Sequence, residues 1–190
     1  MENFEKLKEI GERIKTLREI EEILPETLAE LNTIPLEEYL AYEAGEKDFS
    51  FTFLYKTAGK LGVDIAELLT GENPHLSTYS VERAGEGLPI NRRHGFSYLH
   101  IASRIKNRIA EPFIVTAPFV EKALNQPISL SVHEGQEMDF VLSGSLKTVV
   151  DGKEEVLNEG DCIYYDSSKP HGMIATSQEG CKFLAIVMKY

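Results

Sequence analysis

Several side chains that can bind metal ions lie close together in the second half of the chain. Ser131 and His133 are two residues apart, so on a β-strand they would point to the same face. A tight turn at Glu134–Gly135 would start the next strand and bring Glu137 back to that face. His171 begins a later strand-like run and can complete the group. A carboxylate and two imidazoles suit a divalent Fe, Mn, Zn, Ni or Cu ion, so the pattern predicts a metal site.

Strand-like patterns surround these residues. Period-2 alternation starts after Gly95, and Asp151–Gly152 is a strong signal for a two-residue hairpin. Further strand-like runs follow at 112–118, 127–133, 137–143, 145–150, 161–166, 171–176 and 182–189. Many short strands at this spacing predict an all-β sandwich or barrel.

The first strand of this region carries further candidates for ligand binding. Tyr98, His100 and Arg104 share one face of a strand predicted over residues 98–106. If that face lines the barrel, these residues and Ser131 would contact a ligand, and Arg104 could pair with a carboxylate or phosphate. The alternative is an exposed edge strand, where basic side chains discourage aggregation.

The first 72 residues have the pattern of five short helices. Apolar side chains at spacings of three and four predict an amphipathic helix over residues 7–17. Further helices are expected to begin at Pro25 and near Pro35, and after the N-capping residues Ser50 and Asp64. Glycine and proline then interrupt residues 73–95. We therefore predict a helical domain at 1–72, a linker at 73–95 and a β-barrel domain at 96–190.

Two segments resemble the paired motifs of the cupin family. In the first, His133, Glu137 and Gly144 match at the family spacing, and Ser131 replaces the first histidine. In the second, His171 matches together with Gly160, and the resemblance spans most of residues 97–188. It implies a double-stranded β-helix, or jelly-roll, barrel. It also implies a ligand set of His133, Glu137 and His171.

A set of two histidines and one carboxylate is the facial arrangement of non-haem Fe(II) oxygenases. Behind a helical domain, this set is similar to the hydroxypropylphosphonate epoxidase family. That family uses a lysine from its helical domain, and Glu22 occupies the aligned position. The cofactor would be one divalent Fe, Zn, Ni or Mn ion. The alternative is a metal-free sensor in which His133 and His171 only form hydrogen bonds.

The order of signals in residues 9–70 resembles the phage-repressor (XRE) type of helix-turn-helix domain. The matching residues are Ile10–Ile14, Leu17–Arg18, Leu28–Ala29, Glu43–Glu46, Leu61–Val63 and Glu67–Leu69. The family implies that the helix at Leu36–Ala44 enters the DNA major groove. Candidate DNA-contacting residues are therefore Thr33, Glu37, Glu38 and Tyr42.

This presumed recognition helix departs from the family pattern. Thr33 stands where the turn usually has glycine, and the helix contains no Lys, Arg, Asn or Gln. Glu37 and Glu38 would face a polyanion, which disfavours DNA binding. Residues 1–75 hold 17 acidic and 8 basic side chains, a net charge of −9, whereas the whole chain carries −11. An acidic helical domain repels nucleic acid at long range.

The sequence thus predicts an α+β multidomain protein with an all-α helix-turn-helix bundle followed by an all-β cupin barrel. We expect a cytoplasmic location, because there is no signal peptide, no apolar run of 18 residues and only two cysteines. The family resemblance implies a one-component transcriptional regulator that senses a small molecule as a homodimer or higher oligomer. The alternatives are an iron oxygenase whose helical domain no longer binds DNA, and a ligand-binding barrel with neither role. Of these hypotheses, the regulator is favoured over an enzyme.

Overall fold

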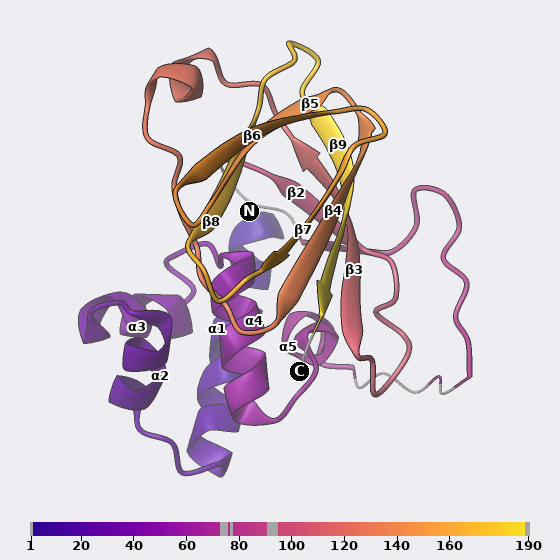
Figure 1. Cartoon of the computed structure of the whole chain (residues 1–190). Coiled ribbons are helices and arrows are strands. Elements are labelled where there is room, and N and C mark those ends of the chain that lie inside the picture. Colours follow the sequence, from indigo (N-terminus) through magenta and orange to yellow (C-terminus); the bar gives the residue numbers. More distant parts are fainter. Residues whose placement is uncertain (1, 73–75, 77, 91–94, 189–190) are drawn as a thin grey trace. The chain divides into compact units, whose positions relative to one another are not determined.

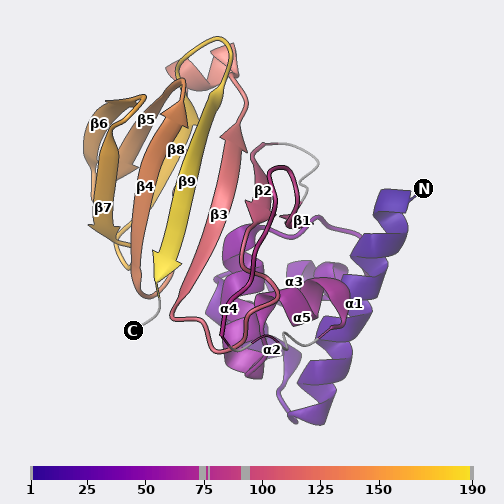
Figure 2. The same ribbon diagram turned by 90° about the vertical axis from the view of Figure 1, so that its right-hand side faces the viewer.

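The computed structural model describes residues 2–72, 76, 78–90 and 95–188. The chain folds as two compact units, Met1–Leu76 and Ser77–Tyr190. The first unit is helical and the second is rich in β-strands, as the ribbons of Figure 1 and Figure 2 show. The predicted α+β fold class is therefore confirmed.

Five α-helices make up the first unit within the described residues. They are α1 (Glu2–Ile20), α2 (Pro25–Asn32), α3 (Leu36–Glu43), α4 (Phe51–Leu61) and α5 (Ile65–Thr70). Ser50 caps α4 by accepting a hydrogen bond from the Phe53 amide at 3.0 Å, and Asp64 caps α5 through the Ala66 amide at 2.8 Å. No helix of the described chain is long and apolar enough to cross a lipid bilayer.

The turn between α2 and α3 depends on one left-handed residue. Thr33 adopts φ 57° and ψ 43°, a conformation that glycine accepts without strain. A β-branched residue there costs of order 1–3 kcal/mol. The sequence feature that departs from the helix-turn-helix pattern is therefore a strained residue at the turn itself.

A buried ion pair fixes α3 against α1. Arg18 donates from Nε to Glu43 Oε1 at 2.6 Å and from Nη2 to Oε2 at 3.2 Å. The Tyr39 hydroxyl donates to Glu43 Oε1 at 2.7 Å. All three side chains are buried. Because a buried charge needs a partner, this network ties the orientation of α3 to the end of α1.

The second unit consists of two antiparallel sheets in the described residues. One sheet has the strand order β1-β2-β3-β9-β4-β7 and the other β6-β5-β8. The strands are β1 (Leu88–Ile90), β2 (Ser97–His100), β3 (Ala110–Ala117), β4 (Gln136–Ser143), β5 (Ser145–Val150), β6 (Lys153–Asn158), β7 (Cys162–Asp166), β8 (His171–Ala175) and β9 (Cys181–Met188). A short 3₁₀ helix covers Glu121–Asn125.

Alternation of side chains gives the larger sheet a buried inner face. On β3, β4 and β9 every second residue is buried, which places Glu137 and Glu111 inside the barrel. The strand register aligns both of them with Val187 on β9, the strand between them. Tyr165 on β7 is the cross-strand partner of Glu137 on its other side.

Several strands differ from the sequence prediction. The strand predicted over residues 98–106 ends at His100, because the Ile101 amide makes its last bond to Pro112 and the chain then turns. Residues 127–133 form no strand; only Ser131 pairs, with His171. β1 lies inside the segment assigned to a linker, part of which falls outside the described residues. The Asp151–Gly152 hairpin joins β5 to β6, with φ 49° and 75°.

Candidate metal centre

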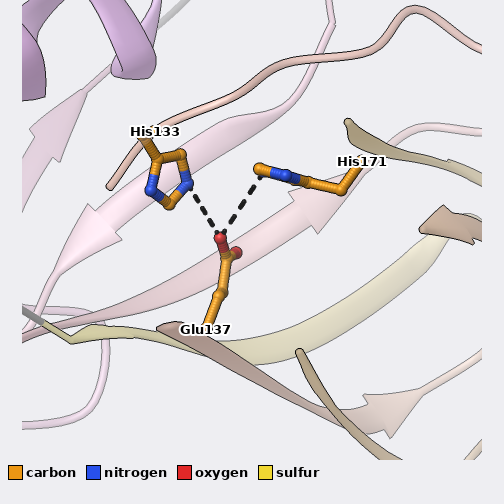
Figure 3. Close-up of side chains that lie close together, drawn as sticks. All are labelled: His133, Glu137 and His171. Carbon is orange, nitrogen blue, oxygen red and sulfur yellow. Dashed lines mark hydrogen bonds and ion pairs between the residues drawn. The ribbon is translucent and has the colours of Figure 1, made fainter. Parts of the chain in front are cut away.

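Three elements bring His133, Glu137 and His171 together. Glu137 lies on the inner face of β4, and His171 is the first residue of β8 in the opposite sheet. His133 precedes β4, where its amide donates to the Ser167 carbonyl at 3.0 Å. Figure 3 shows both imidazoles directed at the Glu137 carboxylate.

The geometry of the three side chains is close. Glu137 Oε2 lies 3.1 Å from His133 Nε2 and 3.9 Å from His171 Nε2. One ligand atom from each residue lies within 4.8 Å of the others, and all three residues are buried. No other group of this kind occurs in the part of the chain that the structure describes.

Backbone carbonyls set which nitrogen of each histidine faces inward. His171 Nδ1 lies 2.8 Å from the Lys169 carbonyl, and His133 Nδ1 lies 3.4 Å from the Glu134 carbonyl. A carbonyl can only accept, so both Nδ1 atoms carry the hydrogen in these contacts and each Nε2 faces the Glu137 carboxylate, where a metal ion would bind. Burial lowers the pKa of His171, which favours the neutral, metal-binding form.

The donor set fits a divalent ion. Bonds of about 2.0–2.1 Å separate neighbouring ligand atoms by roughly 3.0–3.4 Å. The His133–Glu137 distance already lies in this range, and the His171–Glu137 distance needs a small side-chain movement. Such an ion would supply Lewis acidity or redox chemistry and would keep open coordination positions.

Ser131 stands beside the group but is not part of it. Its hydroxyl lies 3.3 Å from His171 Nε2, so it can hydrogen-bond with that imidazole. The backbones of the two residues exchange hydrogen bonds, at 2.8 Å from the Ser131 amide and 3.0 Å from the His171 amide. This bridge ties the segment before β4 to the strand that carries a candidate ligand.

The other predicted ligand-binding residues lie apart from the three. Tyr98 and His100 are on the inner face of β2, but His100 Nε2 donates to Glu111 at 2.7 Å, and Arg108 pairs with the same carboxylate at 2.9 Å. The ring of Tyr98 packs edge-on against the ring of Phe113. Arg104 faces solvent in an ion pair with Glu82 at 2.9 Å. The structure therefore does not bring Arg104 to the candidate metal centre.

Sequence reasoning missed two residues beneath the centre, Asp139 and Tyr165. Asp139 is completely buried, and the Tyr165 hydroxyl donates to its Oδ2 at 3.3 Å. Burial and the nearby Glu137 charge hold the pKa of Asp139 well above its ordinary value. The signal was present for Asp139, which is two residues from Glu137 on one strand. Tyr165 becomes visible only through the pairing of β4 with β7.

The predicted DNA-contacting residues are spread over the turn before α3 and the length of α3, and the Tyr42 ring near its end stacks on Phe53 with 4.4 Å between ring centroids. Glu37 is exposed, and Glu38 pairs with Lys47 at 2.8 Å. The Lys47 ammonium also lies 5.8 Å from the centre of the Tyr42 ring. Thr33 occupies the preceding turn. One cation thus offsets one of the two acidic side chains of this surface.

The comparisons with known proteins agree with this architecture. Residues 125–187 match the family described as "Cupin domain". This match supports the predicted cupin-type barrel over these residues. No curated protein matches the chain.

Solved structures share the fold over nearly the whole chain. An HTH_3 family transcriptional regulator from Vibrio cholerae matches with a TM-score of 0.74 and 20% identity, covering 99% of both chains. Hydroxypropylphosphonic acid epoxidase from S. wedmorenis matches with a TM-score of 0.51 and 21% identity, covering 96% of this chain and 98% of that one. The Fe(II) form of HppE gives the same TM-score and identity, covering 96% and 99%. At this identity the matches show the fold alone.

Proposed function

We propose that this protein is a one-component transcriptional regulator whose cupin domain binds a divalent metal ion and a small molecule. One observation carries the proposal: the fold matches, over 99% of both chains, a protein described as an HTH_3 family transcriptional regulator. Further support comes from the order of five helices with the left-handed turn at Thr33.

The cupin domain supplies the sensing part of the proposal. His133, Glu137 and His171 leave coordination positions that a small molecule can occupy. A ligand that binds one conformation better than another shifts the population towards it. The regulator would act as a cytoplasmic homodimer or higher oligomer, because helix-turn-helix units contact two half-sites of DNA together.

The helical unit would contact DNA through the turn and α3. Glu37 can accept a hydrogen bond from a cytosine amino group, and Thr33 and Tyr42 are further proposed contacts. The acidic charge of this unit weakens phosphate contacts. We therefore expect modest affinity that depends strongly on base sequence and is lost as salt rises.

Two measurements test the proposal. Metal analysis of the purified protein should find about one ion per chain, and His133→Ala should lose it. Fluorescence anisotropy with duplexes from the gene's own upstream DNA should detect binding at low salt that exceeds binding to a shuffled duplex. Absence of any duplex binding at low salt contradicts the regulator function, whatever the metal content.

A second candidate function is a non-haem iron oxygenase, favoured by the same three residues. The two-histidine, one-carboxylate set is the facial triad of such enzymes, and HppE shares the fold at a TM-score of 0.51. Oxygen consumption by Fe(II)-loaded protein with hydroxypropylphosphonate tests this candidate. Glu22 replaces the lysine that the family resemblance implies, so we expect no turnover. Substrate-dependent oxygen uptake that His171→Ala abolishes would favour the enzyme instead.

A further inference from the structure

The inner face of β4 carries a second carboxyl group where an apolar side chain is expected. Asp139 lies two residues beyond Glu137, and its cross-strand partners are Ala185 on β9 and Ile163 on β7. Its side chain has no exposed surface. Burying a carboxyl group costs several kcal/mol unless partners compensate, so its place in this core calls for a role.

Asp139 and Tyr165 form a connected group behind Glu137. Tyr165 is the cross-strand partner of Glu137, yet its hydroxyl donates to Asp139 Oδ2 at 3.3 Å. Burial and the neighbouring carboxylates, Glu137 among them, raise the pKa of both groups. Asp139 Oδ1 has no hydrogen-bond partner among the described residues.

Glu137 needs such a support on geometric grounds. Both histidines approach the same oxygen, Oε2, at 3.1 and 3.9 Å. Contacts to one oxygen leave the plane of the carboxylate free to rotate. Groups that hold a ligand from behind fix its orientation, and their loss typically lowers metal affinity about 10–100-fold.

We propose that Asp139 and Tyr165 are positioning residues that hold Glu137 in its metal-binding orientation. This inference rests on the proposed metal site. Asp139 is not itself a ligand, because the group of atoms within 4.8 Å consists of His133, Glu137 and His171 alone in the described chain. The tyrosine hydroxyl and the second carboxyl group act through Glu137.

Cobalt(II) titration of the full chain tests the inference, because the absorption spectrum of the ion reports ligand geometry as well as affinity. Tyr165→Phe and Asp139→Leu should each weaken Co(II) binding about 10–100-fold and change the spectrum. Asp139→Asn should bind within a few-fold of the wild type, since an amide can donate to Glu137 and accept from Tyr165. Tyr164→Phe is the matched control, because that side chain is exposed on the opposite face of the same strand.

The outcomes separate this inference from the proposed function. If the wild type binds no Co(II), the metal site fails and the inference fails with it. If the wild type binds and folded Tyr165→Phe gives the same affinity and spectrum, the inference alone is overturned. Folded Asp139→Asn that binds as weakly as the leucine variant also overturns it. Circular dichroism establishes folding, and Tyr165→Phe keeps the test decisive if Asp139→Leu does not fold.

Discussion

Replacing Glu137 with glutamine should act in opposite directions on the metal-free and the metal-loaded protein. Without metal, Glu137 adds a negative charge next to buried Asp139, whose pKa is raised by burial and by this neighbour. As a general scale, two unit charges 4 Å apart repel by about 4 kcal/mol at an effective dielectric constant of 20. Protonation of Asp139 relieves part of that repulsion. We therefore expect Glu137→Gln to stabilise the metal-free protein by about 1 kcal/mol.

With metal, the same substitution should remove a larger stabilisation. An ion at 100 times its dissociation constant stabilises the folded state by about 2.7 kcal/mol. A 100-fold loss of affinity leaves only about 0.4 kcal/mol at the same concentration. At about 4 °C per kcal/mol, the metal-dependent rise in melting temperature should fall from about 10 °C to about 2 °C.

Differential scanning calorimetry with and without Zn(II) or Mn(II) measures both effects. Glu134→Gln is the matched control, because that side chain is exposed next to the centre and its backbone carbonyl is unchanged. Equal metal-dependent shifts in the wild type and Glu137→Gln would refute the assignment of Glu137 as a ligand. A large loss of metal-free stability in Glu137→Gln would refute the electrostatic argument.

Three further predictions concern stability and DNA affinity. The pKa of Asp139 is raised in the folded state, so its contribution to stability is present below about pH 4 and is lost as pH rises. The melting temperature of Asp139→Asn should therefore be higher than that of the wild type at pH 7 and equal to it near pH 4. Glu43→Ala removes the buried carboxylate that pairs with Arg18 and leaves only the Ile23 carbonyl and the exposed Glu19 as its partners. The free energy of unfolding in urea titrations should fall by about 3–5 kcal/mol, and a loss below 1 kcal/mol would contradict the buried pair. Glu37→Lys should strengthen duplex binding in anisotropy titrations and steepen the salt dependence of the affinity by about one counterion. Glu9→Lys on α1 is the control, and it should strengthen binding only if the duplex binds non-specifically.

The helical unit could be predicted from sequence because its signals are local. Ser50 and Asp64 cap helices through amides two or three residues away, so their meaning does not depend on the tertiary structure. Asp151–Gly152 is equally local, since two left-handed residues make a tight hairpin whatever lies around them.

The barrel was less completely predictable because its contacts join distant residues. The alternating pattern continues past His100 in the sequence, but the strand ends there. The last hydrogen bond at this end runs from the Ile101 amide to the Pro112 carbonyl. Arg104 consequently leaves the inner face and pairs with Glu82. His133, Glu137 and His171 were predicted through motif spacing and lie together, whereas Tyr165 depends on a strand register that no local pattern encodes.

The paired backbone bonds between Ser131 and His171 make the state of the centre readable by hydrogen exchange. Each amide of this bridge is donated to the other residue's carbonyl, and the ring of His171 is a candidate ligand. An ion that holds the ring must slow the local opening that exposes both amides to deuterium. Occupancy of the metal site would thus appear as protection at two named backbone positions, in a measurement that requires neither the identity of the small molecule nor that of the operator.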